Sequence, residues 1–146
     1  MCGIAGYVGD RESADVLVDA LSKLEYRGYD SAGIAVFDHG NIKVKKCKGR
    51  LANLVEKMDE EGKPQGHVGI GHTRWATHGE PSETNAHPHH SDDGNVVAVH
   101  NGIIENYQEL RDKLTKKGYE FYSQTDTEVA VKLIDYYYKK YEGTPV

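Results

Sequence analysis

The chain has 146 residues, enough for one domain with a buried core and too few to expect two. Hydrophobic residues make up 38%, charged residues 28%, and the formal net charge is −5, which fits a globular chain and excludes a general nucleic-acid footprint. No stretch approaches the roughly 18 apolar residues of a membrane span, and no signal-peptide pattern opens the chain. Cys2 and Cys47 do not make a disulfide framework, so we expect a cytosolic protein with free thiols.

The N-terminal part of the chain predicts a strand followed by a helix. CGIAGYV (2–8) is a short apolar run typical of a buried strand, and the sequence from 11 to 28 then changes to helical spacing. Asp10 is a candidate N-cap of this helix and Gly28 a candidate stop. Its apolar stripe is formed by Ala14, Leu17, Leu21 and Leu24.

A hairpin, a second helix and a further strand come next. SAGIAVFD (31–38) and NIKVKKCK (41–48) predict paired strands around the turn DHGN, and LANLVEKMDEE (51–61) predicts an amphipathic helix. HVGIGH (67–72) reads as a strand that ends at His72. Since hairpin signals outnumber simple βαβ alternation, we expect the α+β class with layers of sheet and helix.

The last part of the chain begins with a long polar stretch, residues 73–94. It has two prolines and no sustained period, which favours a functional loop. NVVAVHN (95–101) predicts a strand, and YQELRDKLTKKG (107–118) predicts a helix that stops at Gly118. A final helix is predicted over 125–141, with Thr125 and Glu128 as a possible capping box.

Three segments at the ends of predicted strands are candidates for function, because rigid scaffolds display functional groups on such loops. They are EYRGYDSAG (25–33), HTRWATHGEP (72–81) and HNGIIEN (100–106). Each also fits a plain structural role: the first as a helix stop with Arg27 on the surface, the last as a strand-to-turn junction at Asn101–Gly102. The segments alone leave both interpretations open.

Six histidines crowd one region of the chain: His72, His78, His87, His89, His90 and His100. HPHH (87–90) could be part of a metal cluster, but the helical HExxH spacing of zinc enzymes is absent. Exposed loop positions or polar contacts behind a site are the more usual roles of such residues. Zinc binding therefore stays an alternative.

Cys2 and Asp126 each have a structural and a chemical interpretation. Cys2 is either a small hydrophobic residue at the head of the first strand or, after removal of Met1, a nucleophile that carries its own free α-amine. Asp126 complements the dipole at the start of the last helix. Its carboxylate can at the same time accept hydrogen bonds from a ligand's ammonium group.

Five ordered segments together resemble one known family: CGI, LEYRGYDSAGIAV, GIGHTRWATHGEPSETNAHPH, VHNGIIENY and SQTDTEV. They are similar to the N-terminal glutaminase domain of the isomerizing glutamine–fructose-6-phosphate aminotransferases, the glucosamine-6-phosphate synthases. Amidophosphoribosyltransferases and asparagine synthetases share the CGI start and an RG-D-AG element, but typically lack YRGYDSAG and TRWATHGEP as written here. The resemblance implies the fold of an N-terminal nucleophile hydrolase, a four-layer αββα sandwich of antiparallel sheets, here truncated.

The resemblance implies that Cys2 attacks the side-chain amide of L-glutamine. The α-amine of Cys2 would be the general base, and its reference pKa of about 7.7 to 8.0 suits that task near neutral pH. The amide of Asn101 and the backbone N–H of Gly102 would stabilise the oxyanion. Ammonia would leave, and water would then hydrolyse the thioester to glutamate.

The resemblance also implies the residues that bind glutamine. Arg74 would pair with the α-carboxylate and Asp126 with the α-ammonium group. Further residues would close over the substrate or shape the surroundings of the nucleophile, namely Trp75, Thr77, His78, Arg27 and Gly28. No cofactor and no metal are implied.

Residues 2–146 would form part of a class II glutamine amidotransferase domain, and the sugar isomerase domains of the family are absent. In the full-length enzyme those domains bind fructose 6-phosphate and receive the ammonia, and a homodimer is expected. The alternative to an enzyme is a module that binds an amino acid without turnover. Because strands of the missing part would pair with the sheets, we expect exposed strand edges and marginal stability.

Overall fold

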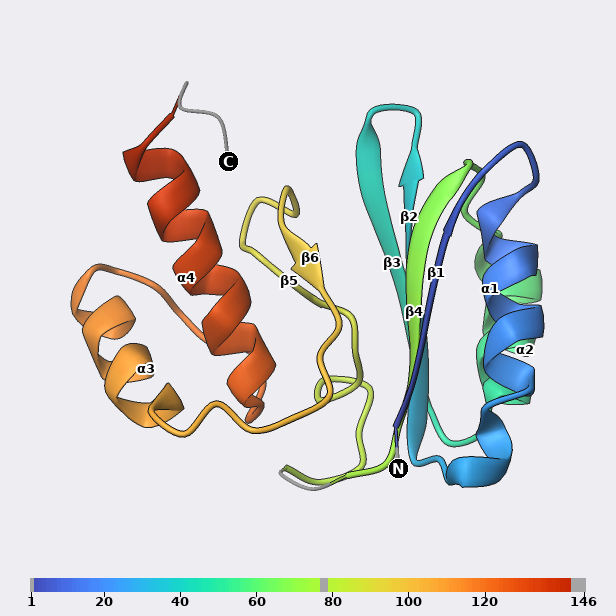
Figure 1. Cartoon of the computed structure of the whole chain (residues 1–146), viewed down its shortest axis with the longest axis horizontal. Coiled ribbons are helices and arrows are strands. Elements are labelled where there is room, and N and C mark those ends of the chain that lie inside the picture. The colour runs from blue at the N-terminus through green and yellow to red at the C-terminus, as the bar shows by residue number, and fades with distance from the viewer. Residues whose placement is uncertain (1, 77–78, 143–146) are drawn as a thin grey trace.

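The structure is a computed structural model that describes residues 2–76 and 79–142 in four layers (Figure 1). Helices α1 and α2 cover one face of a four-stranded sheet. A two-stranded sheet lies on its other face, where helix α4 packs against it and helix α3 packs beside α4. Among the helices of these residues, none has the length and apolar character needed to cross a membrane. The elements are β1 (Gly3–Val8), α1 (Ser13–Ser22), the 3₁₀ turn η1 (Glu25–Arg27), β2 (Ser31–Asp38), β3 (Asn41–Lys48), α2 (Leu51–Glu61), β4 (Val68–Arg74), β5 (His89–His90), β6 (Val97–Ala98), α3 (Tyr107–Lys116) and α4 (Asp126–Lys140).

The larger sheet is antiparallel throughout, with the strand order β1-β4-β2-β3. The β2–β3 hairpin pairs from Ser31 and Lys48 down to Asp38 and Asn41, which confirms the predicted hairpin residue for residue. β4 lies between β1 and β2, so its last residue, Arg74, is next to the beginnings of both. The start of the chain, the loop before β2 and the loop after β4 therefore meet at that end of the sheet.

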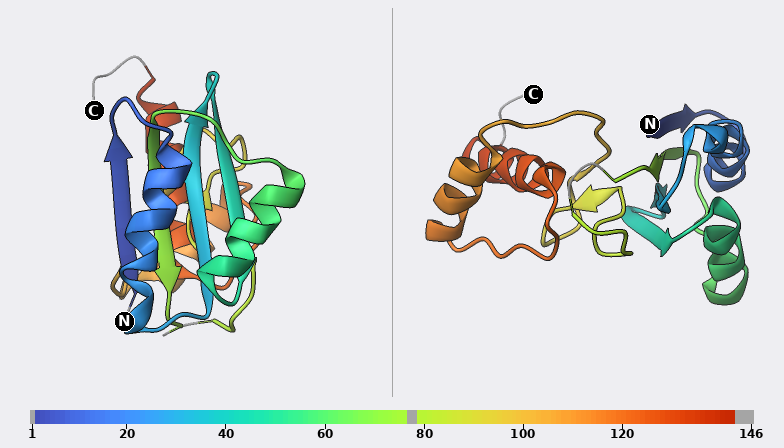
Figure 2. Two further views of the ribbon diagram at one scale, coloured as in Figure 1. Left: turned by 90° about the vertical axis from the view of Figure 1, so that its right-hand side faces the viewer. Right: turned by 90° about the horizontal axis from the view of Figure 1, so that it is seen from below.

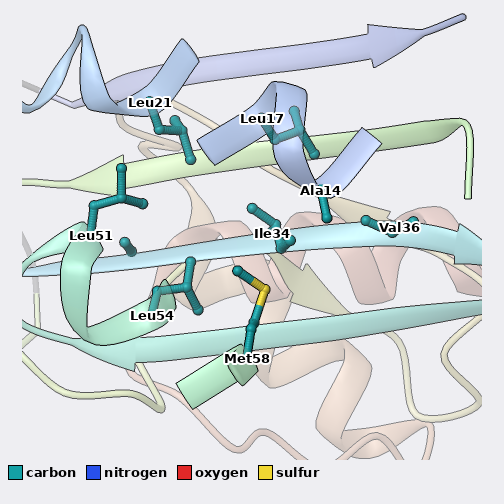
Figure 3. Packing of buried hydrophobic residues seen from close by; sticks show 9 residues of the cluster. Ala14, Leu17, Leu21, Ile34, Val36, Leu51, Leu54 and Met58 are labelled. Atoms are coloured by element: carbon teal, nitrogen blue, oxygen red, sulfur yellow. The ribbon is translucent and has the colours of Figure 1, made fainter. Parts of the chain in front are cut away.

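The hydrophobic core lies between the sheet and helices α1 and α2, which run side by side over one face (Figures 2 and 3). Leu17 and Leu21 of α1 are fully buried, as the helical spacing predicts. α1 comes this close because β4 presents glycines: a Cβ at Gly69 would lie 2.8 Å from Leu17, and one at Gly71 would lie 2.9 Å from Leu21. Burying each such leucine contributes about 1.5–3 kcal/mol.

The layer between the two sheets is polar and rich in histidine. The ring of His72 on β4 stacks on His87 at 4.2 Å between centroids, and His87 meets His89 edge-on at 4.6 Å. Burial lowers the pKa of His72 to about 4 and that of His89 to about 2, and it also lowers the pKa of His87. The three rings are therefore neutral at physiological pH.

The first helix differs from the sequence prediction at both ends. α1 begins at Ser13, and its N-cap is Glu12 rather than Asp10; Glu12 makes no side-chain capping bond, and its carboxylate accepts from the N–H of Gly66 instead. The helix ends at Ser22, and Gly28 follows the separate turn η1. The predicted helix was thus too long by about two turns over its two ends, and at the C-terminal end the chain tightens into 3₁₀ geometry after Leu24, which is only partly buried.

The strands that border the polar stretch also differ. β4 continues past the predicted end at His72 to Arg74, since Thr73 and Arg74 pair with β2. The polar stretch is not wholly irregular, because His89–His90 pairs with Val97–Ala98 as the small sheet. Of the strand predicted over 95–101, only Val97 and Ala98 have strand geometry.

The capping box of α4 is formed only in part. The Thr125 hydroxyl accepts from the backbone N–H of Glu128, as predicted. The reciprocal half is wrong, since the Glu128 carboxylate accepts from the N–H groups of Tyr122 and Ser123 instead. Glu128 therefore fastens the preceding loop to the helix.

The buried histidines predict a stability that falls in acid. Between pH 6.5 and about 4 the unfolded chain binds a proton at His72 that the folded chain excludes, so the free energy of unfolding decreases as the pH falls through this window. Each ring that stays neutral contributes up to about 1.4 kcal/mol per pH unit. Urea unfolding at pH 7, 6 and 5 measures the slope, which His89→Gln reduces and His67→Gln, at an exposed ring, leaves as it is. A pH-independent free energy of unfolding would contradict the prediction.

Candidate active site

Cys2 lies at the end of the sheet where β1 begins and β4 ends. The pairing of Gly3 with Thr73 brings the residue before β1 beside the residues after β4. The backbone N–H of Trp75 donates to the Cys2 sulfur at 3.2 Å, and the thiol lies 3.4 Å from the Trp75 carbonyl oxygen. The thiol thus has a fixed place although it is at the start of the chain.

The Cys2 thiol opens into a cavity of about 330 Å³, at the lower end of the range usual for small-molecule sites. Segments that are far apart in the chain build its wall: the start of β1, the end of β4, the loop before α3 and the first turn of α4. Six residues that the resemblance assigns to the site line this one cavity: Cys2, Arg74, Trp75, Asn101, Gly102 and Asp126.

The Asn101–Gly102 loop reaches Cys2 from the second half of the chain. The side-chain nitrogen of Asn101 donates to the Cys2 carbonyl oxygen at 3.2 Å, and its side-chain oxygen lies 2.7 Å from Nε2 of His72. Gly102 has a φ of +148°, and a Cβ there would lie 3.0 Å from Nε2 of His100. The loop thereby presents the side-chain amide N–H of Asn101 beside Cys2.

Asp126 is the first residue of α4 and contributes a carboxylate to the cavity wall. Its Oδ2 accepts from the backbone N–H of Ile104 at 2.8 Å. This bond ties the loop that carries Asn101 to the N-terminus of the helix. A negative charge is favourable at this position because of the helix dipole.

Arg74, a positively charged residue, lines the same cavity. It is only 3% exposed, and its guanidinium donates to the carbonyl oxygens of Gly79 at 3.0 Å and Glu80 at 3.1 Å. Oδ1 of Asp30 lies 3.5 Å from the guanidinium. Arg74 therefore supports the turn at Gly79–Glu80 as well as lining the cavity.

Asp30 is a supporting residue that the sequence analysis did not single out. Its backbone N–H donates to the Arg74 carbonyl oxygen at 2.7 Å, and its carboxylate accepts from the N–H of Ala76. It thus fixes the chain on both sides of Trp75. The aspartate was visible within YRGYDSAG, but its partners lie more than 40 residues away in the chain, so no local signal identifies them.

Gly28 touches the site through Trp75. With φ at +110°, it has a conformation that favours glycine, and a Cβ there would lie 2.7 Å from the indole ring. Arg27 is exposed at the end of η1 and is not part of the cavity wall. Thr77 and His78, the other residues expected to close over a substrate, and Met1 lie outside the described residues.

The histidines are arranged ring against ring. Across residues 2–76 and 79–142, no group of three or more His, Cys, Asp or Glu side chains has an arrangement that could hold a metal ion. His89 instead bonds the Tyr122 hydroxyl and the Thr125 hydroxyl, both at 2.9 Å. The ring of His87 contacts the rings of His72 and His89, and His87 also lines the cavity.

Comparison with known proteins agrees with this geometry. Residues 43–141 match the sequence model of the glutamine amidotransferase domain. The chain belongs to this family. The predicted class of enzyme domain is thereby confirmed.

The curated relatives are much longer proteins. The chain is 63% identical over 139 residues to the isomerizing glutamine–fructose-6-phosphate aminotransferase of Clostridium tetani, covering 95% of this chain and 23% of that protein. Its namesake from Pyrococcus horikoshii is 57% identical over 135 residues, covering 92% and 22%. The chain thus spans under a quarter of the length of these relatives.

Solved structures show the same fold. The glutamine phosphoribosylpyrophosphate amidotransferase of B. subtilis, complexed with ADP and GMP, is 28% identical and matches with a TM-score of 0.77, over 100% of this chain and 30% of that one. A structure described as the allosteric regulatory enzyme of purine biosynthesis matches with a TM-score of 0.78 at 27% identity, again over 100% and 30%. The α+β N-terminal nucleophile hydrolase fold is confirmed, with a second sheet of two strands in the part of the chain described here.

The contact between Gly28 and Trp75 gives a prediction that fluorescence can check. Trp75 is the only tryptophan, is 51% exposed, and would be pushed outward by a methyl group at residue 28. We expect Gly28→Ala to shift the emission to longer wavelength. Gly62→Ala is the matched control, because Gly62 has a φ of +101° but nothing within 4 Å of its Cβ position. Equal spectra for the two variants would contradict the prediction.

Proposed function

We propose that this chain hydrolyses the side-chain amide of L-glutamine to glutamate and ammonia through a thioester on Cys2. The observation that carries the proposal is that the Cys2 thiol shares one cavity with the cation of Arg74 and the carboxylate of Asp126. A free amino acid carries both opposite charges on its α-carbon. A cavity with one charge of each sign and a nucleophile therefore suits an amino acid with a reactive side chain.

The nucleophile is activated by its own α-amine once Met1 has been removed. A free α-amine has a reference pKa of about 7.7 to 8.0, so part of it is neutral near pH 7 and can accept the thiol proton. The sulfur then attacks the amide carbon of glutamine. The contacts of Cys2 with Trp75 and Asn101 hold the residue for this attack.

The attack places negative charge on the amide oxygen of the substrate. The side-chain N–H of Asn101 and the backbone N–H of Gly102 donate to this oxyanion, and one such donor is worth roughly 3 to 4 kcal/mol in comparable sites. The carbon–nitrogen bond then breaks, the ammonium form of the α-amine returns its proton to the nitrogen, and ammonia leaves. Water attacks the remaining thioester and releases glutamate.

Recognition of glutamine uses the two charges and the neighbouring loop. Asp126 accepts from the α-ammonium group, and the guanidinium of Arg74 pairs with the α-carboxylate. The residues assigned to closure over the substrate or to its surroundings are Trp75, Thr77, His78, Arg27 and Gly28. Closure would exclude water while the thioester forms.

For the longer protein we propose that residues 2–146 are part of its glutaminase domain. The ammonia would pass to sugar isomerase domains that convert fructose 6-phosphate to glucosamine 6-phosphate. The names of the relatives support this assignment, because they describe an aminotransferase that uses glutamine and fructose 6-phosphate. A homodimer and a cytosolic location belong to the same proposal.

The role of Cys2 predicts a complete loss of turnover in Cys2→Ala. Glutamate release from L-glutamine is measured on chains shown by intact mass to lack Met1, and we expect a decrease of about three orders of magnitude or more. Cys47→Ala is the control, since Cys47 lies on β3 outside the cavity. Glutamine binding by calorimetry without glutamate release from the wild-type chain would favour the binding module instead.

The role of Asp126 predicts a selective loss of substrate affinity in Asp126→Asn. The variant removes a charged acceptor for the α-ammonium group but keeps an oxygen for the N–H of Ile104, so KM for glutamine should rise about 10- to 100-fold. Asp112→Asn on α3 is the matched control, because this exposed carboxylate lies outside the cavity and accepts from the side chain of Gln108. Equal KM values for the two variants would exclude the proposed contact.

A further inference from the structure

The side-chain amide of Asn101 has two chemically different ends, and only one of them can stabilise an oxyanion. The NH₂ end donates hydrogen bonds, whereas the oxygen end only accepts them. Rotation of the amide by half a turn would place an oxygen beside the developing negative charge and repel it. Whatever holds this amide in one orientation therefore controls the oxyanion site.

The structure shows what faces each end. The nitrogen of the Asn101 amide points to the Cys2 carbonyl oxygen at 3.2 Å, and the oxygen lies 2.7 Å from Nε2 of His72. A carbonyl oxygen offers only lone pairs, so it can face Nε2 favourably only when that nitrogen carries the proton. The orientation of Asn101 thus depends on the tautomer of His72.

We propose that His72 is a positioning residue, whose Nε2–H donates to Oδ1 of Asn101 and so directs the Asn101 N–H groups toward the oxyanion of the Cys2 reaction. This inference rests on the proposed hydrolysis of glutamine. His72 itself lies outside the cavity wall, so it acts through Asn101 and not on the substrate.

His72 is held in place by its strand pairing and by a ring stack. Its backbone is in the middle of the sheet, paired with Ile4 of β1 and Gly33 of β2. Its ring is 1% exposed and stacks on His87 at 4.2 Å with 19° between the planes. Gly33 permits this stack, since a Cβ there would lie 2.0 Å from the His87 carbonyl oxygen.

The surroundings of the ring favour one tautomer. Burial lowers the pKa of His72 to about 4, so the ring carries a single proton at neutral pH. Nδ1 is buried and has no hydrogen-bond partner among the residues that the structure describes. A proton on Nδ1 would leave a donor unsatisfied and would also bring two lone pairs together at Asn101. The Nε2–H tautomer avoids both costs.

Two substitutions separate the hydrogen bond from the packing. His72→Leu fills similar space without a donor, and His72→Gln offers a carboxamide N–H near the position of Nε2. We expect His72→Leu to lower kcat for glutamine about 100- to 1,000-fold, the effect of losing an oxyanion donor, with KM changed less than about 2-fold. His72→Gln should recover most of kcat. His90→Leu, which removes a half-buried ring outside the cavity, is the control.

Alkylation of Cys2 by iodoacetamide distinguishes a positioning role of His72 from a purely structural one. If the substitution damaged the site itself, the rate of alkylation would also change. Displacement of iodide by the thiolate develops no oxyanion, so the rate should be the same in the wild-type chain and both variants. An unchanged kcat in His72→Leu overturns the proposal, as does an equal loss in His72→Gln. A parallel loss of alkylation would also overturn it, because the site itself would then have been damaged.

The ring tautomer is measured independently of turnover by ¹⁵N NMR of the histidine side chains, with His72 assigned from the His72→Gln spectrum. The Nε2–H form is expected, and the Nδ1–H form overturns the proposal even if the chain releases no glutamate. Absence of turnover in the wild-type chain, with the Nε2–H tautomer present, counts against the proposed function but not against this hydrogen bond.

Discussion

The antiparallel register of three strands is the constraint on which the rest of the structure depends. Pairing of β4 with β1 brings Cys2 beside Trp75, and pairing of β4 with β2 brings Asp30 beside Arg74. A shift of either register by one residue would turn every side chain to the opposite face of the sheet. Core packing and site geometry are therefore fixed by the same set of backbone hydrogen bonds.

The two faces of the four-stranded sheet have different roles, one in apolar packing and the other in polar contacts. The face toward α1 and α2 is apolar and supplies the stability, while the other face holds neutral histidines that make directional contacts. Stacked rings are less adaptable than aliphatic side chains, and their unsatisfied nitrogens cost free energy. The apolar face offsets this cost. The polar face in return links β4, through His72 and Asn101, to the loop fixed by Asp126.

Turn residues and apolar spacing in the sequence predicted those elements that depend on interactions between residues close together in the chain. The β2–β3 hairpin and helix α2 have the predicted bounds, because turn chemistry and apolar spacing act over a few residues. β5 was missed and the strand that contains β6 was predicted too long, since two-residue strands carry no periodic signal and exist only through their pairing. For the site, the resemblance supplied six of the residues that line the cavity. Asp30 was not singled out, and the role of His72 was left open among six crowded histidines, because their partners Ala76 and Asn101 lie 46 and 29 residues away in the chain.

The position of Cys2 at the start of the chain imposes a cost, since terminal residues fray unless they are tied down. β1 is an edge strand, paired only with β4, so the sheet alone restrains Cys2 from one side. The N–H of Trp75 and the amide of Asn101 supply the remaining restraint on its sulfur and carbonyl. These two residues belong to the cavity as well. The groups that order Cys2 are thus the groups that line the cavity, so ordering of the terminus and assembly of the cavity are one event.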